Sequence, residues 1–227
     1  YTAGIEQRKK ITDAQIEVAC LTTQMNEELF YQFNFLYNYG FLKTQYADFN
    51  MYSKADLTAL GIACTEINEC DPHLLSKCIY TGLFDGLTED QLIAGLAVFL
   101  GAEKDREIKY SSLKRVLDPI YQMEITINEQ RRQAGIADLE PPLSDYWVDP
   151  VMAWITEGKM GAVYNENDEA EALGEGEFVK AILKVNNIAE EVLNVANLLQ
   201  LDVLAKKLEN AKTRLVWGMV TPHSLYL

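Results

Sequence analysis

Residues 176–199 read GEFVKAILKVNNIAEEVLNVANLL, and their apolar side chains recur at alternating spacings of four and three. The apolar stripe consists of Phe178, Ile182, Val185, Ala189, Val192, Ala196 and Leu199. This period is typical of a long α-helix with one buried face. A polar line with the same rhythm lies on another side of the helix and consists of Lys180, Lys184, Asn187, Glu191 and Asn194. The sequence therefore predicts a long helix with one buried side and one solvent-exposed, partly basic side.

A second helix is predicted from Asp202 to about Trp217, with Asp202 as its N-cap. Its matching apolar stripe consists of Leu204, Leu208, Ala211 and Leu215. Only residues 199–201 join the two helices, so they are expected to fold back as an antiparallel hairpin. We therefore expect a mainly α protein built on a helical bundle.

Composition limits the classes of function. The chain has 227 residues, of which 48% are hydrophobic and 24% charged, and its net charge is −14. Such an acidic chain is unlike proteins that bind nucleic acid over their whole surface, although a local basic strip remains compatible with it. The sequence carries no signal peptide and no apolar run near eighteen residues, a length required for a membrane span. We expect an intracellular protein of the nucleus or cytoplasm with no membrane partner. Because it begins at Tyr1, we also expect the sequence to be part of a longer chain.

The N-terminal part predicts two helices and an irregular region. Residues 5–24 have too few apolar positions to fill a core face and are expected to form a solvated helical arm. A second helix is expected from Asn26 to Tyr39, ended by Gly40 as a C-cap. The aromatic-rich stretch that follows, up to Ile67, could hold two short strands as a β-hairpin and so complete a winged-helix unit. The alternative is an irregular connection.

Local signals predict further helices. Asp71 followed by Pro72 is a helix start, and Thr88 with Gln91 forms a capping box. A helical region through residues 113–127 contains Pro119, which should kink or split it. A short helix is expected after Pro150, with Val151, Trp154 and Ile155 buried, and residues 165–177 are expected to form an acidic loop.

Four side chains within fifteen residues, Cys64, Cys70, His73 and Cys78, raise the question of a zinc site. Their spacings of five, two and four include no paired C-x-x-C motif of the usual kind. Free cysteines are commonly small buried hydrophobes, so structural thiols are the favoured interpretation and a metal site the alternative.

Catalytic motifs are scarce. The sequence contains no G-x-x-x-x-G-K-[ST] phosphate loop, and no serine or cysteine nucleophile has a convincing base partner. The acidic run 69–73 precedes a helix, so we interpret it as a cap rather than as a magnesium-binding box. Glu190 and Glu191 are interpreted as a solvated face. The chain by itself is therefore expected to be non-catalytic and to need no cofactor or metal.

Several short segments are similar to one known family. They are residues 224–227 (SLYL), 175–176 (EG), 195–197 (VAN), 35–41 (FLYNYGF), 61–67 (GIACTEI) and 87–103. Together they resemble the C-terminal DSHCT domain of DExH-box RNA helicases of the superkiller and exosome-cofactor class. The resemblance spans about residues 26–227 and needs no gap from Glu175 onward.

The resemblance implies three parts: a helical arm at 1–24 that ends an insertion, a winged-helix-like portion at 25–68 and a DSHCT-like bundle at 69–227. It implies a module that caps two RecA-like motor domains and guides single-stranded RNA past a long "ratchet" helix. The RNA-binding residues implied are Lys180, Lys184, Asn187 and Glu103, with both lysines standing where the family has arginines.

The resemblance also implies what lies outside this chain. ATP and magnesium are expected on the motor domains, which would make the parent chain an ATP hydrolase, and exosome-associated proteins are candidate partners. The alternative from the residues alone is a helical protein–protein docking domain without RNA contact, which the acidic balance and the aromatic-rich 30–52 stretch favour.

Overall fold

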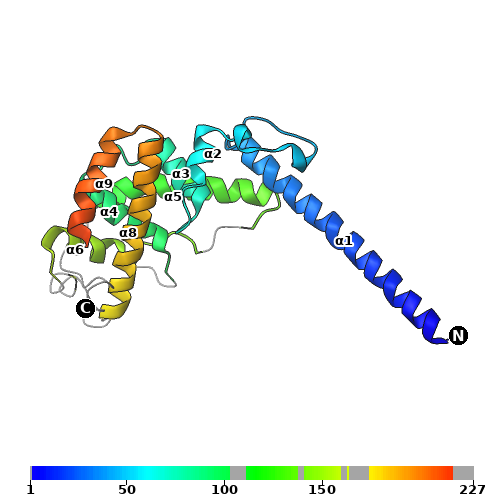
Figure 1. The fold of residues 1–227 in the computed structure, drawn as a ribbon. Helices are drawn as coiled ribbons and strands as arrows, with labels where there is room; N and C mark the ends of the chain where they lie inside the picture. The colour runs from blue at the N-terminus through cyan, green and yellow to red at the C-terminus, as the bar shows by residue number, and fades with distance from the viewer. Residues whose placement is uncertain (1, 103–110, 138–140, 160–162, 164–173, 217–227) are drawn as a thin grey trace, which may run out of the picture.

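The long helix α8, Glu175–Leu198, forms one side of a helical bundle together with α9 (Figure 1). The computed structural model describes residues 2–102, 111–137, 141–159, 163 and 174–216. After α8 the chain reverses into α9, Asp202–Leu215, and Gln200 takes a positive φ of 59° in the turn. The predicted antiparallel hairpin is confirmed.

More of α8 is buried than its sequence stripe indicated. Phe178, Ile182 and Val185 are buried as predicted, and so are the other stripe members except the partly buried Leu199. Ala181, Ile188 and Val195 are buried as well. The reason is that α8 packs against α9 on one side and against α3, α4 and the 3-10 turn η3 on others. Neighbours on several sides widen the buried face beyond a single stripe.

The layer against α8 consists of α3, Pro72–Tyr80; α4, Glu89–Leu96; and η3, Ala97–Leu100, while α2, Ala59–Cys64, packs on α3. The caps predicted at Asp71 and Thr88 are confirmed, whereas the N-cap predicted at Asp202 is wrong, because Leu201 takes that position and Asp202 lies in the first turn of α9. The Asp71 carboxylate accepts the Leu74 N–H at 2.6 Å, and the Thr88 hydroxyl accepts the Gln91 N–H at 3.2 Å. These caps satisfy N-terminal amides that have no partner within the helix.

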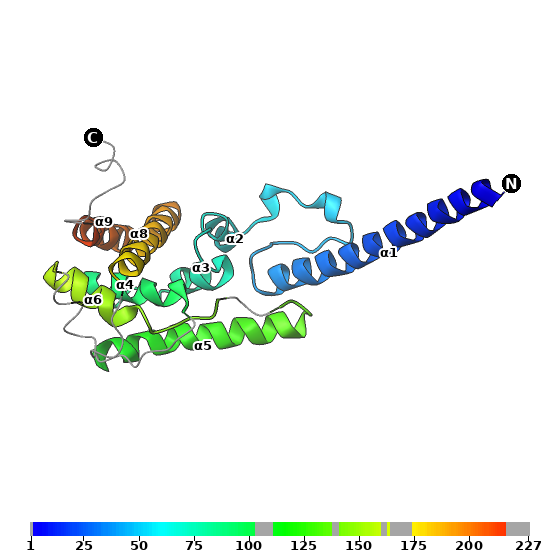
Figure 2. The same cartoon turned by 90° about the horizontal axis from the view of Figure 1, so that it is seen from below.

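Two more helices complete the bundle. α5, Ser111–Gln133, continues through Pro119 without being split, and α6, Val148–Glu157, buries Val151, Trp154 and Ile155 as predicted. The Trp154 indole N–H donates to the Leu215 carbonyl at 2.7 Å, which ties α6 to the end of α9. Figure 2 shows α5 running along one side of the bundle.

One continuous helix, α1, Thr2–Asn38, projects from the bundle as a long arm (Figures 1 and 2). It runs without interruption across residues 24–25, where we predicted a boundary; the domain division itself stays a prediction. The helix ends as predicted: Gly40 has a φ of 81°, and the Phe41 N–H returns to the Leu36 carbonyl at 2.8 Å.

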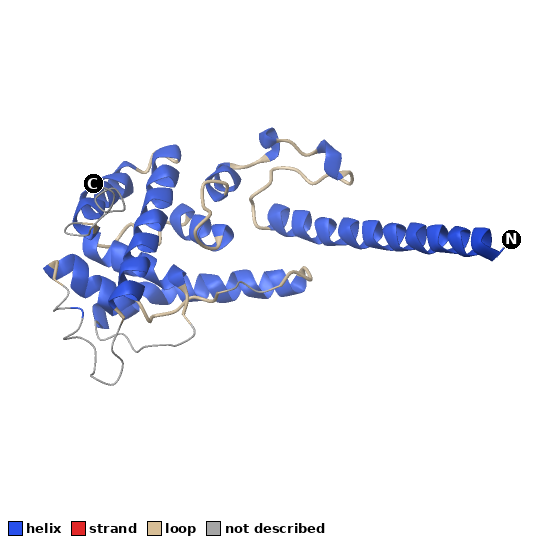
Figure 3. Ribbon diagram, turned by 60° about the horizontal axis from the view of Figure 1, so that its bottom comes forward, coloured by secondary structure: helices blue, strands red, loops and turns tan. Residues whose placement is uncertain are grey.

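The predicted β-hairpin after Gly40 is wrong. Within the described residues there is no strand (Figure 3), and only one isolated antiparallel bridge joins Leu42 to Leu57. Between them lie the 3-10 turns η1, Phe49–Met51, and η2, Lys54–Asp56. One aromatic residue that suggested strands, Tyr52, instead stacks on Phe33 of α1, with the ring centroids 4.2 Å apart. The winged-helix-like portion at 25–68 stays a prediction, and it lacks the hairpin that was expected in it.

Some predictions concern residues outside the described part of the chain. They include Glu103, most of the acidic loop and the C-terminal segment 217–227. In the part that the structure describes, none of the helices combines the length and the apolar character needed to cross a membrane.

Gly61 lets α2 approach the turn after α1 closely, so replacing it tests this packing. A Cβ atom at this position would lie 2.1 Å from the Phe41 carbonyl oxygen, which is backbone and cannot swing away. We expect Gly61→Ala to lower the free energy of unfolding by about 1–3 kcal/mol, although alanine is the better helix former. Urea unfolding of the chain measures this.

Gly176 provides the matched control, since it also lies in a helix but a Cβ there meets nothing within 4 Å. Gly176→Ala should raise the free energy of unfolding by up to about 1 kcal/mol. Equal effects of the two substitutions would contradict the packing of α2 described above.

Candidate nucleic-acid interface

Lys180 and Lys184 of the polar line both line one hollow at the N-terminal end of α8. The hollow has a volume of about 600 Å³. Three segments line it: Leu100, Gly101 and Ala102 after η3, Tyr146 and Trp147 before α6, and Glu177, Lys180, Ala181 and Lys184 of α8. Lys180 is exposed and Lys184 is half-buried. The hollow therefore combines two cations, one carboxylate and two aromatic rings.

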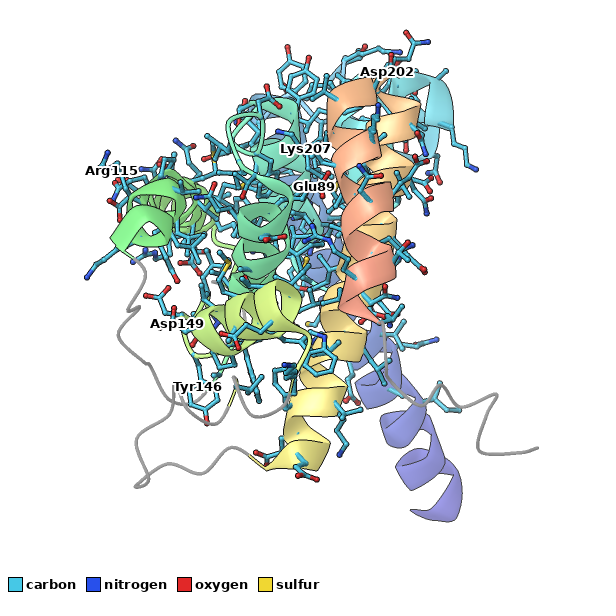
Figure 4. All side chains as sticks on the ribbon, turned by 90° about the vertical axis from the view of Figure 1, so that its left-hand side faces the viewer. Glu89, Arg115, Tyr146, Asp149, Asp202 and Lys207 are labelled. Atoms are coloured by element: carbon cyan, nitrogen blue, oxygen red, sulfur yellow. The ribbon has the colours of Figure 1, made fainter. Side chains whose placement is uncertain are left out.

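The aromatic pair comes from a loop that is fixed to the bundle. The buried Ser144 donates its N–H to the Val98 carbonyl at 3.1 Å, and the Leu143 N–H donates to Glu124 Oε1 at 2.9 Å. The Tyr121 hydroxyl donates to the carboxylate of Asp145. These contacts tie the loop to η3 and α5, so Tyr146 and Trp147 are held in place before any ligand binds. Figure 4 shows Tyr146 beside α6, at the end of the bundle where α8 begins.

Further along α8, side chains of the polar line bind another segment of the chain instead of lining the hollow. The Asn187 amide donates to Glu69 Oε1 at 3.1 Å, and the Glu191 carboxylate accepts the Asn68 and Glu69 N–H groups at 3.0 and 3.1 Å. The interpretation of Glu191 as part of a solvated face is therefore wrong, because it holds the segment that leads into α3. Asn187 does not line the hollow, and its role in RNA binding stays a prediction.

Charged contacts also fix α9 on α4. Lys207 Nζ donates to the Asp85 and Leu87 carbonyls at 2.8 and 2.7 Å, and Arg214 pairs with Glu89 at 2.9 Å and Asp90 at 2.7 Å. Figure 4 labels Lys207 and Glu89 at this contact. Glu190, also interpreted as solvated, pairs with Lys212 of α9 at 2.7 Å. These cations are engaged by the bundle.

His73 belongs to a buried polar cluster between α1, α3 and α5. Arg131, which is 6% exposed, donates to Asp71 Oδ2 and to His73 Nδ1, each at 2.7 Å. Arginine can only donate, so His73 Nδ1 accepts and the imidazole is neutral, with its proton on Nε2. Burial lowers the pKa of His73, while the nearby Asp71 opposes the shift. Sequence reasoning missed Arg131, because no local pattern links residue 131 to residues 71–73.

Burial favours the neutral thiol form of the cysteines considered as zinc ligands. Burial raises the pKa of Cys64 to about 11 and that of Cys78 to about 12, and it raises the pKa of Cys70 strongly as well. Metals bind the thiolate rather than the thiol. Among the described residues, no group of three or more His, Cys, Asp or Glu side chains could hold a metal ion. Structural thiols stay the favoured prediction for these cysteines, and a metal site stays the alternative.

The His73 cluster predicts how stability depends on pH. Burial lowers the pKa of His73 in the folded chain below the ordinary 6.5. As the pH falls, His73 therefore takes up a proton in the unfolded chain before it does so in the folded chain. The contribution of His73 to the free energy of unfolding is thus complete above pH 6.5. It is lost as the pH falls from 6.5 toward the pKa of His73 in the folded chain. We expect a loss of at most about 1.4 kcal/mol per pH unit, measured as the free energy of unfolding.

The variant His73→Gln isolates this effect from the titration of carboxylates. Its amide oxygen can still accept from Arg131, yet it does not titrate. The variant should therefore lose less stability than the native chain between neutral pH and pH 5. Identical pH dependence of the two would show that His73 is not held neutral by this cluster.

Comparison with known proteins identifies the family. The family model of the DSHCT (NUC185) domain matches residues 54–221. An uncharacterised helicase of Schizosaccharomyces pombe is 27% identical over 177 residues, and "Exosome RNA helicase MTR4" of Homo sapiens is 24% identical over 173 residues. Another relative, "mRNA transport homolog 4" of Caenorhabditis elegans, is 23% identical over 172 residues.

Each match covers 73% or 74% of this chain, and the chain spans only 16% of the length of each relative. The similarity thus concerns one part of much longer proteins. Since the family model covers well over half of the chain, the predicted resemblance is confirmed, and the chain belongs to the DSHCT (NUC185) domain family.

Proposed function

We propose that this chain is a non-catalytic C-terminal module of an ATP-dependent RNA helicase, and that α8 guides single-stranded RNA through it. The observation that carries the proposal is the hollow in which Lys180 and Lys184 lie beside Tyr146 and Trp147. Cations beside aromatic rings are the combination that single-stranded nucleic acid requires, because phosphates need positive charge and bases need flat surfaces. The relatives named as helicases support the same function.

The acidic net charge does not oppose a local RNA contact. At physiological ionic strength, exposed charges are largely screened beyond about 8 Å, so a strand in the hollow interacts mainly with the side chains that line it. Lys180 and Lys184 are one helical turn apart and repel each other mildly. A phosphate between them would relieve that repulsion. As lysines they attract phosphate as point charges but lack the planar guanidinium that binds bidentately.

The remaining residues implied by the family fit the proposal to different degrees. Glu103 lies outside the described residues, and its contact with RNA is proposed from the family resemblance alone. Asn187 would have to exchange its hydrogen bond to Glu69 in order to contact RNA.

The proposal assigns the chemistry to other parts of the parent protein. ATP and magnesium would bind its RecA-like motor domains, on which the bundle would stack, and ATP hydrolysis would take place there. Exosome-associated proteins are proposed as further partners, in line with the name of the relative "Exosome RNA helicase MTR4" of Homo sapiens.

A second candidate function is protein docking through α1. This arm exposes large apolar side chains, among them Ile16 at 58%, Val18 at 63%, Leu21 at 53% and Met25 at 61%. Exposed apolar surface on a projecting helix favours a protein partner. The two functions differ in which surface they use, so they can be tested separately.

Reversing both charges at the hollow tests the RNA function. In the full-length protein, Lys180→Glu with Lys184→Glu should weaken binding of single-stranded RNA and slow unwinding. Each lost phosphate contact should reduce the slope of log K against log salt by about 0.7. Because Lys180 is exposed and Lys184 half-buried, the thermal unfolding of the variant should change little.

The matched control is the pair Lys114→Glu and Lys206→Glu, which changes the net charge equally at exposed positions of α5 and α9. The control should leave RNA affinity and salt slope almost unchanged. If the variant at the hollow and the control behaved alike, α8 would not guide RNA, and docking through α1 would become the favoured function.

A further inference from the structure

We propose that Trp147, braced by Tyr146, is a stacking site for one unpaired base in the hollow. This inference rests on the proposed function and adds to it a residue that contacts the base rather than the phosphate. It would supply the flat surface that two lysines in place of arginines cannot provide.

The size and composition of the hollow suit one nucleotide. Its volume of about 600 Å³ lies within the range of about 300–1,000 Å³ found for small-molecule pockets. Gly101 and Ala102 add little side-chain bulk to the lining, which leaves room for a planar group near the backbone. The carboxylate of Glu177 only accepts hydrogen bonds, so it suits a ribose hydroxyl or a base amino group rather than a phosphate.

Trp147 is half-buried and packs on the core, so its ring is anchored while part of it remains accessible from the hollow. Tyr146 meets it edge to face, with the ring centroids 5.0 Å apart and the planes at 88°. This geometry is favourable for aromatic pairs and restricts rotation of the indole. A ring that is already fixed loses little conformational freedom when a base stacks on it.

The backbone around the hollow is equally constrained. Gly101 has a φ of 62°, and a Cβ there would lie 2.5 Å from Pro141 Cβ, so the loop that carries Trp147 lies directly against the end of η3. Hydrogen bonds from Ser144 to Val98 and from Leu143 to Glu124 hold the same loop. The distance from the lysines on α8 to the rings is therefore set by the bundle rather than by a ligand.

The test separates base contacts from phosphate contacts. The full-length protein is titrated with a single-stranded oligouridylate and with an abasic ribose-phosphate strand of the same length. Trp147→Leu should weaken binding of the oligouridylate by about 5- to 150-fold, the range for loss of one stacked base. Binding of the abasic strand and the salt slope should change little, because both depend on phosphates.

Two further variants keep the test decisive. Trp147→Phe retains an aromatic ring and should restore most of the affinity for the oligouridylate, even if Trp147→Leu disturbs the fold. Lys180→Glu with Lys184→Glu should instead reduce binding and salt slope on both strands.

The possible results separate this inference from the proposed function. If neither strand binds, the proposed function and the stacking site are both wrong. If both strands bind with a salt slope and the ratio of their affinities is the same in Trp147→Leu, only the stacking site is wrong, and Trp147 is a packing residue.

Discussion

The burial of α8 between α9 and the layer formed by α3, α4 and η3 is the interaction on which the rest of the structure depends. Its apolar face, from Phe178 to Ala196, has no exposed member. Each buried aliphatic side chain contributes roughly 1.5–3 kcal/mol of hydrophobic stabilisation, so this face outweighs any single polar contact in the bundle. Because the neighbours are packed on several sides, α8 cannot rotate about its axis without exposing apolar surface. Its polar side chains therefore have fixed directions.

That constraint divides the polar side of α8 into two parts. Towards its C-terminal end, Asn187 and Glu191 bind the segment that leads into α3, and Glu190 binds Lys212 of α9. Towards its N-terminal end, Lys180 and Lys184 line the hollow. A cation paired with a carboxylate is a poor partner for phosphate, whereas a lysine facing an open hollow is a good one. The division thus confines the proposed RNA contact to one end of the helix.

The sequence predicted the hairpin of α8 and α9 well, because a long apolar period with a short join permits few alternatives. It also predicted the caps at Asp71 and Thr88, where hydroxyl or carboxylate groups act within one turn. It failed where side chains meet across the fold. The strand prediction after Gly40 rested on aromatic residues, yet Tyr52 of that stretch stacks on Phe33 of α1 instead.

The same limit applies to the candidate site. Lys180 and Lys184 could be selected from the helical period and from the family resemblance. Trp147 could not, because it lies far from them in sequence and approaches α8 only through the loop fixed on η3 and α5. Arg131, likewise, meets His73 and Asp71 only in the folded chain. Residues brought together by packing leave no pattern along the sequence.

Photo-crosslinking of single-stranded RNA containing 4-thiouridine to the full-length protein tests the central claim most directly. Crosslinked peptides, identified by mass spectrometry, report which surface of this module lies against the bases. The account predicts crosslinks in the segments that line the hollow, 100–102, 146–147 and 177–184. Crosslinks in this module confined to α1 or to the outer face of α9, with none at the hollow, would contradict it.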